Sequence, residues 1–133
     1  MTTTIHTVDI VVATTAGYVL LIERGHDPYA GHWALPGGRV DAGETSLQAA
    51  VRELAEETGI YAAEAELDEI GVWDAPGRDP RGRYVTTAYG LTVIPGTIVE
   101  AGDDAARAEW WPLTALPLLA FDHADILRAA TTR

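Results

Sequence analysis

Three glutamates at helical spacing are the residues of this chain best suited to chemistry. Glu53 and Glu57 are one helical turn apart and Glu56 lies between them, so in an α-helix their side chains share an arc of about 100°. Their like charges repel one another, and Arg52 is the only neighbouring base. Clustered carboxylates suit a hard cation such as Mg²⁺ or Mn²⁺, and Mg²⁺ commonly joins protein carboxylates to substrate phosphates. The spacing predicts a divalent-metal site, with a solvated acidic helix face as the alternative.

Acidic residues are concentrated around these glutamates. The chain has 20 acidic and 9 basic residues, a formal net charge of −11. Residues 41–69 contain nine of the acids and one arginine, a net charge of −8, and the other 104 residues carry −3. A solvated acidic face usually has lysines interspersed, and this chain has no lysine. The negative charge also argues against nucleic acid as a partner, because the phosphate backbone would repel it.

Length and composition indicate a single domain that spans residues 1–133. The chain is 47% hydrophobic, enough for a packed core, and it lacks cysteine, which excludes disulfides, thiolate catalysis and cysteine-bound metals. The sequence shows no secretory leader and no apolar run long enough to cross a bilayer. We therefore expect a cytoplasmic protein without a membrane partner.

The helix that positions the glutamates is predicted over residues 45–58. Thr45 and Gln48 match a capping box at its start, and Gly59 supplies the stop at its end. Its apolar face, which we expect to pack on the core, comprises Leu47, Ala50, Val51, Leu54 and Thr58. The glutamates are then expected roughly opposite that face, away from the core.

The remaining segments predict a mixture of strands and a second helix. Apolar, β-branched segments predict strands at residues 5–14, 18–24, 33–35, 67–73 and 84–94. The first two flank the turn signal Ala16-Gly17 and should form a hairpin. A helix is predicted over residues 122–130, with Asp122 as its N-cap and His123 as a structural residue. This mixture predicts an α/β sandwich with a mixed sheet.

A longer pattern surrounds the glutamates. Gly38 is followed after five residues by Glu44, and after seven more by the run 52–60, Arg-Glu-Leu-Ala-Glu-Glu-Thr-Gly-Ile. This pattern reproduces the Nudix box, and the segment from Trp33 to Gly38 resembles the usual approach to that box. The chain therefore resembles the Nudix hydrolases, and the resemblance implies a Nudix-type α/β/α sandwich with a mixed β-sheet.

The resemblance also implies roles for the residues of the box. The metal ligands would be the carbonyl of Gly37 and the carboxylates of Glu53, Glu56 and Glu57. Arg52 would orient the glutamates and Glu44 would support the loop, the alternative being a plain ion pair between the two. Hydrolysis also needs a general base. In this family the base is a box glutamate or an acid on a later loop, which leaves open Glu57, Glu53, Glu100, Asp103 and Asp104.

A second stretch concerns the substrate. Pro76 follows the box by 16 residues. With the loop Gly77–Gly82 (GRDPRG) it resembles the ADP-ribose pyrophosphatases of the family. Arg78 and Arg81 would contact phosphate or ribose oxygens, and Asp79 would pair with an arginine or accept a ribose hydroxyl. The alternative is a surface turn with a local ion pair. The other expected phosphate contacts, near the box in sequence, are Arg24 and Arg39.

The resemblance implies Mg²⁺-dependent (or Mn²⁺-dependent) hydrolysis of a small-molecule nucleoside diphosphate derivative. The leading hypothesis is ADP-ribose, cleaved to AMP and ribose 5-phosphate. The alternative enzyme is a nucleoside triphosphate pyrophosphatase that cleans the nucleotide pool. A further alternative is a sensing module like the Nudix-related regulators. Those proteins carry a DNA-binding domain, for which this chain has no room, and often a degraded box, whereas this box is intact.

Two further features follow from the resemblance and the composition. Relatives of the ADP-ribose type are usually dimers that share the site, so we expect a homodimer. Aromatic side chains are the natural surfaces on which a nucleobase stacks, although core packing is the common role of each. The aromatic candidates are Trp33, Trp73, Tyr84, Tyr89, Trp110 and Trp111.

Overall fold

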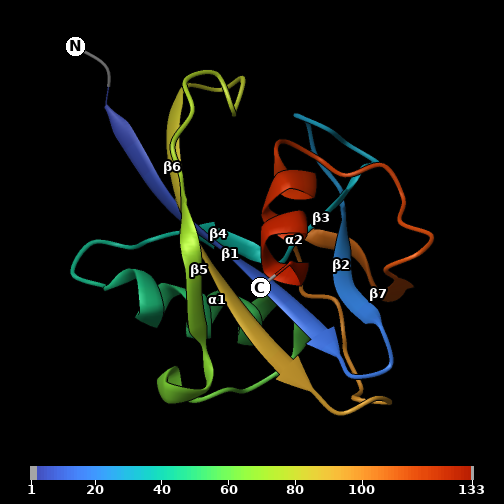
Figure 1. Cartoon of the computed structure of the whole chain (residues 1–133). Helices are drawn as coiled ribbons and strands as arrows, with labels where there is room; N and C mark the ends of the chain where they lie inside the picture. Colours follow the sequence, from blue (N-terminus) through green and yellow to red (C-terminus); the bar gives the residue numbers. More distant parts are fainter. Residues whose placement is uncertain (1–2, 133) are drawn as a thin grey trace.

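A mixed β-sheet with a helix on each face organises residues 3–132, the part of the chain described by the structure, a computed structural model (Figure 1). In chain order the elements are β1 (Thr4–Thr14), β2 (Tyr18–Arg24), β3 (Trp33–Ala34), β4 (Gly37–Arg39), α1 (Ser46–Thr58), a 3₁₀ turn (Glu64–Glu66), β5 (Asp68–Trp73), β6 (Arg83–Val93), β7 (Ala105–Pro112) and α2 (His123–Thr131). Neither α-helix of this region is long and apolar enough to cross a membrane.

The two longest strands form the centre of the sheet. β1 and β6 pair in parallel along all 11 residues of each. The strand order is β3-β2-β1-β6-β5, with β4 pairing with β1 and β7 pairing with β2. β1 pairs with β2 at Ala13↔Val19, beside their shared turn, and its earlier residues pair with β4 at Thr7↔Arg39. The sheet therefore divides, with β1 and β4 on one side and β2 and β3 on the other.

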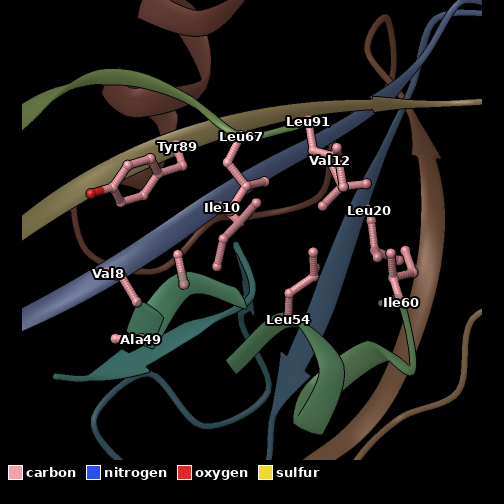
Figure 2. Close-up of a cluster of buried hydrophobic side chains, with 11 residues drawn as sticks. Val8, Ile10, Val12, Leu20, Ala49, Leu54, Ile60, Leu67, Tyr89 and Leu91 are labelled. Atoms are coloured by element: carbon pink, nitrogen blue, oxygen red, sulfur yellow. The ribbon is translucent and has the colours of Figure 1, made fainter. Parts of the chain in front are cut away.

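Alternate side chains of β1 reach the two helices. Val8, Ile10 and Val12 are fully buried in the core beneath α1, which Figure 2 shows in close-up. Val11 points to the other face and packs in the cluster that contains Ile126 of α2. The two-residue period of the strand thus supplies one apolar face to each helix. The predicted α/β/α sandwich with a mixed sheet is confirmed.

The helix of the box begins and ends as predicted. The hydroxyl of Thr45 accepts a hydrogen bond from the Gln48 amide, and the Gln48 side chain accepts one from the Thr45 amide. Gly59 ends α1 with φ of 75°, a left-handed conformation that favours glycine. The buried face differs slightly from the predicted one, since Leu47 and Val51 are partly buried and the fully buried residues are Ala49, Ala50, Leu54 and Thr58.

Two expectations from the sequence are corrected by the structure. Residues 105–112 form strand β7 along β2, although the sequence predicted no strand there. The first five residues of β7 are alanine, arginine and glutamate, which show no apolar alternation, so the pairing of this strand with β2 decides its conformation. Asp122 occupies the N-cap position of α2 but makes no capping hydrogen bond. Its carboxylate is instead engaged by Arg78.

Candidate active site

A cavity of about 400 Å³ opens where the sheet divides. Its walls come from β1, β2, the segment around β3 and β4, the end of α1, the loop before β6 and the start of α2. Its polar and aromatic lining comprises Thr7, Asp9, Arg24, His26, Glu57, Arg78, Asp79, Arg81, Tyr84, Asp104, Phe121 and His123. The fold thus places one glutamate of the box opposite arginines from two other elements.

Two glycines bring the backbone of β4 against the acidic side chains. A β-carbon on Gly38 would overlap the carboxylate of Glu53, and one on Gly37 would overlap the carbonyl oxygen of Val8 and lie 2.6 Å from Oδ1 of Asp9. The Gly37 N–H donates a long hydrogen bond, 3.4 Å, to Oε2 of Glu57. Only glycine permits this approach, which sets the strand backbone directly beside the carboxylates of the helix.

Glu53 and Glu57 are largely buried carboxylates that resist simultaneous ionisation. Burial, and next the charge of Glu53, raises the pKa of Glu57 to about 9. Burial also raises the pKa of Glu53, against the opposing effect of the Arg52 guanidinium. A divalent cation at these oxygens would favour both ionised forms. The pair therefore fits a metal by its charge as well as by its oxygen ligands.

Arg52 connects the acidic residues around the box. Its Nε and Nη2 donate to the two carboxylate oxygens of Glu44 at 2.8 and 3.0 Å, and its Nη1 donates to Glu53 at 2.9 Å. Nη2 also donates to the carbonyl of Arg39 at 2.9 Å. The hydrogen bonds from Arg52 lower the pKa of Glu44 to about 2. One guanidinium thus joins the loop before α1, the strand β4 and the helix.

Glu56 lies apart from the other two glutamates of the helix. Its side chain is 58% exposed and accepts a hydrogen bond from Arg52, whereas the side chain of Glu53 is 13% exposed. Within residues 3–132, no three acidic or histidine side chains converge as a ready-made metal cage. The expectation that the glutamates face away from the core was wrong for Glu53 and Glu57, because β4 packs along that side of α1 and encloses them.

The loop between β5 and β6 holds its arginines in ion pairs. Arg78 is 5% exposed and donates from Nε and Nη2 to the two oxygens of Asp122 at 2.9 and 2.6 Å. Arg81 donates in the same way to Asp79 at 3.0 and 2.7 Å. Burial opposes ionisation of Asp79, but the hydrogen bonds from Arg81 outweigh it and hold the pKa of this carboxyl below its ordinary value. The local ion pair left open by the sequence is present, and Arg78 is bound to α2.

Guanidinium groups and aromatic rings alternate in a row that begins at one wall of the cavity and continues outside it. Arg24 lies 4.9 Å from the ring centroid of Phe121, and Arg81 lies 5.5 Å from Phe121 and 4.7 Å from Tyr84. Arg39 extends the row, 5.9 Å from Tyr84. A guanidinium over a ring face is a favourable contact. We call these five residues the cation–aromatic row; it presents flat faces and positive charge together.

Phe121 was missed by sequence reasoning. Of the six aromatic candidates named from the sequence, Tyr84 is the one that lines the cavity, while Tyr89 and Trp33 are buried in the two cores. Phe121 stands in a loop with φ of 53°, so no periodic pattern marks it. The available signal was its type, because it is the only phenylalanine of the chain and it directly precedes Asp122.

The other expected residues divide between the cavity and its surroundings. Arg24 lines the cavity and donates from Nε to the carbonyl of Pro28 at 2.7 Å. Arg39 lies outside the lining, where its Nη2 donates to the hydroxyl of Tyr84 at 3.1 Å. Among the acids considered as general base, Glu57 and Asp104 line the cavity, and those outside the lining are Glu53, Glu100 and Asp103.

Asp9 and His123 form a buried polar pair at the back of the cavity. Oδ2 of Asp9 accepts a hydrogen bond from the Thr86 hydroxyl at 2.7 Å, and Oδ1 lies 3.5 Å from Nε2 of His123. Nδ1 of His123 accepts a hydrogen bond from the Leu35 amide at 3.0 Å. Burial raises the pKa of Asp9 and lowers that of His123. The sequence signal for Asp9 was a lone acid within the apolar run 8–12 of β1.

Comparison with known proteins identifies the family. The NUDIX domain family matches residues 3–130. An ADP-ribose pyrophosphatase of Methanocaldococcus jannaschii is 47% identical over 110 residues, covering 83% of this chain and 63% of that protein. An ADPR responsive transcriptional repressor, NtrR, of Acinetobacter baylyi is 37% identical over 119 residues, covering 86% of this chain and 47% of that protein. This chain therefore spans less than two-thirds of the length of both relatives.

A solved structure agrees in fold. The NUDIX domain of Shewanella oneidensis NrtR, complexed with ADP ribose, matches with a TM-score of 0.91 and 30% identity, covering 100% of this chain and 90% of that one. The match extends over the sheet and both helices, well beyond the box. Together with the family match, it shows that the chain belongs to the NUDIX domain family, that of the Nudix hydrolases.

Proposed function

We propose that this protein is a Mg²⁺-dependent hydrolase that cleaves ADP-ribose to AMP and ribose 5-phosphate. The observation that carries the proposal is the cavity, in which Glu57 and the backbone of Gly37 and Gly38 face arginines and aromatic rings. Carboxylates that lack a counterion suit a metal, arginines suit phosphate, and flat rings suit a nucleobase. The 47% identical relative is an ADP-ribose pyrophosphatase, which favours the same substrate.

The residues of the box are the ones that would hold the metal. We assign this role to the carbonyl of Gly37 and to Glu53, Glu56 and Glu57. Mg²⁺ or Mn²⁺ bound there would neutralise the diphosphate and favour ionisation of the attacking water. Glu56 is exposed, and the one oxygen that contacts Arg52 leaves its other carboxylate oxygen available to a cation. Arg52 and Glu44 would keep the helix and β4 in register while the glutamates bind.

The side chains of the cavity supply the other parts of the reaction. A water oxygen attacks one phosphorus atom while the bridging P–O bond breaks, and the bridging oxygen leaves with the other phosphate. Glu57 or Asp104 would accept the proton of the water, since both line the cavity. Arg24 and Arg81 would bind the nonbridging phosphate oxygens and reduce their repulsion of the nucleophile.

The cation–aromatic row would hold the nucleoside. A nucleobase has a flat face like that of the guanidinium of Arg81, which the rings of Phe121 and Tyr84 already contact.

Sensing without hydrolysis is the other function favoured by a specific observation, the 37% identity to the repressor NtrR. The intact box and the Glu53–Glu57 pair favour catalysis. We also propose a homodimer, to be checked by analytical ultracentrifugation.

A substrate panel tests the proposal directly. Purified protein is incubated with ADP-ribose, NADH, diadenosine polyphosphates, and normal and oxidised nucleoside triphosphates, each with Mg²⁺, Mn²⁺ or EDTA. We expect ADP-ribose to have the highest kcat/KM and to yield AMP and ribose 5-phosphate, with no turnover in EDTA. Faster turnover of a triphosphate would support the nucleotide-pool alternative. Tight binding of ADP-ribose without hydrolysis in any metal would support a sensor and overturn the enzyme.

A further inference from the structure

The segment that carries Gly37 and Gly38 has few backbone restraints of its own. β3 has two residues, and β4 has three, of which Gly37 and Gly38 pair with Asp9 and Val8 of β1, so neither strand provides a long hydrogen-bonded ladder. Between the two strands, Leu35 and Pro36 are held by hydrogen bonds to other elements of the chain. The amide of Ile10 donates to the carbonyl of Pro36 at 2.8 Å, and the amide of Leu35 donates to His123 at 3.0 Å. A helix at the far end of the sequence thus supplies one of the restraints on the segment that leads into the box.

The contacts of His123 indicate which nitrogen of its neutral ring carries the proton. Nδ1 accepts a hydrogen bond from a backbone amide, so Nδ1 carries no proton and the proton of the neutral ring is on Nε2. Nε2–H then faces Oδ1 of Asp9 at 3.5 Å. The side chain of His123 is 5% exposed, so water does not replace these partners. A single imidazole therefore contacts the segment before β4 and the acid that lies against β4.

Asp9 extends this connection to Gly37. Its Oδ2 is fixed by the hydroxyl of Thr86, which is fully buried. Its Oδ1 would lie 2.6 Å from a β-carbon at Gly37, so the carboxylate packs directly on the glycine. The Gly37 amide in turn donates to Glu57. The contacts run from α2 through Asp9 to the glycine and onward to the glutamate of the box.

We propose that His123 and Asp9 are positioning residues that fix the backbone of Gly37 and Gly38 relative to Glu53 and Glu57. Neither residue needs to touch the reacting atoms. Their effect on turnover rests on the proposed hydrolase function, but their effect on the Leu35–Gly38 backbone does not. A displacement of about 1 Å at such a site can lower a rate by about a hundredfold. His123 would therefore influence kcat through the geometry of the box.

Two conservative substitutions separate the two contacts of His123. In His123→Asn the side-chain oxygen takes the place of Nδ1, so the acceptor for the Leu35 amide is kept and the group facing Asp9 is lost. In His123→Gln the amide reaches the place of Nε2 and the acceptor for Leu35 is lost. His123→Ala removes both. Arg128→Gln is the control, because Arg128 belongs to the same helix and its side chain is 70% exposed.

The measurements cover structure, metal binding and turnover. In the wild type, ¹⁵N NMR should show Nε2 of His123 protonated and Nδ1 unprotonated. His123→Ala should speed amide hydrogen exchange at Leu35, weaken Mn²⁺ binding and lower kcat about a hundredfold, with KM changed less than about threefold. His123→Asn should restore the Leu35 protection and most of kcat, while His123→Gln should not. Thr86→Val, which releases Asp9 without touching His123, should weaken Mn²⁺ binding in a folded protein.

The outcomes distinguish this inference from the proposed function. Changes in Leu35 exchange and Mn²⁺ binding in a protein that hydrolyses no diphosphate would support the positioning role and overturn the enzyme. A wild-type hydrolase whose Leu35 exchange, Mn²⁺ affinity and kcat are unaltered in both His123→Ala and Thr86→Val would overturn the positioning role. So would equal loss of kcat in the Asn and Gln variants. If His123→Ala does not fold, the Asn, Gln and Thr86→Val variants decide the question.

Discussion

Two carboxylates of the box are enclosed without an equal number of cations. Glu53 shares Arg52 with Glu44 and Glu56, and Glu57 has the Gly37 amide as its hydrogen-bond donor in the site. Enclosing such groups costs free energy unless a counter-charge is present. The raised pKa of Glu57, caused first by burial, is the measure of that cost. Because burial of the ionised Glu57 is unfavourable for folding, the position of this residue is best explained by the binding of a cation.

Substitution of these two glutamates tests their role. Glu57→Gln and Glu53→Gln should each lower kcat at least about a hundredfold, because glutamine keeps the shape but offers neither an ionised ligand nor a base. Initial rates at saturating substrate and Mg²⁺ give the effect, and circular dichroism checks the fold. Glu64→Gln, at an exposed acid outside the cavity, is the matched control. Full activity in both variants would rule out the metal assignment.

The cation–aromatic row joins elements that are far apart in the sequence. Arg24 ends β2, Arg81 belongs to the loop before β6, and Phe121 precedes α2. Phe121→Leu keeps an apolar side chain but removes the ring face. KM for ADP-ribose should rise about fivefold to tenfold with little change in kcat, as expected for lost ground-state binding worth about 1 kcal/mol. The control is Tyr61→Leu, whose ring is 87% exposed; equal KM changes in both would contradict the assignment.

The ion pair of Arg78 and Asp122 joins the loop between β5 and β6 to the start of α2. Both side chains are largely buried, at 5% and 16% exposure. Arg78→Ala and Asp122→Ala should each lower the free energy of unfolding by about 3 kcal/mol, because each leaves a buried charge unpaired. The double variant should cost little more than either single one. Urea unfolding measures these values. An Arg78→Ala protein with unchanged stability but a raised KM would instead make Arg78 a substrate ligand.

Local signals account for what the sequence predicted well. The capping box at Thr45, the stop at Gly59 and the β-branched run of β1 act within a few residues, and the structure has the helix ends and the strand that they predict. The partners of Arg78 and the position of Phe121 depend on how α2 docks on the sheet, which no local pattern encodes. The burial of Glu53 and Glu57 was missed for the same reason, since β4 covers them only after the chain has folded.

At the scale of the whole molecule, which carries a net charge of −11, the stability of the fold should depend on pH and on bound metal through Glu57. The pKa of Glu57 rises on folding from 4.5 to about 9, so the folded state retains a proton that the unfolded state loses above pH 4.5. In EDTA, the contribution of Glu57 to stability should decline as pH rises from about 5 to about 9. Mg²⁺ should oppose the decline, because it binds the ionised form.

Thermal unfolding of the wild type and Glu57→Gln checks this prediction. Between pH 5 and pH 9 in EDTA, Tm of the wild type should fall relative to Tm of the variant. At pH 8, millimolar Mg²⁺ should raise Tm of the wild type and have little effect on the variant. Parallel pH profiles for the two proteins, with equal responses to Mg²⁺, would show that Glu57 titrates normally and binds no cation.

The division of the sheet has a consequence for how such a protein can diversify. One side of the cavity is built by β1, β4 and α1, which carry the acidic chemistry, and the other by the β5–β6 loop and the approach to α2. Replacements at exposed positions of the β5–β6 loop leave the strand pairing and the residues of the box unchanged. The ligand that the cavity accepts can therefore change through this loop, while the acidic side of the cavity is inherited unaltered.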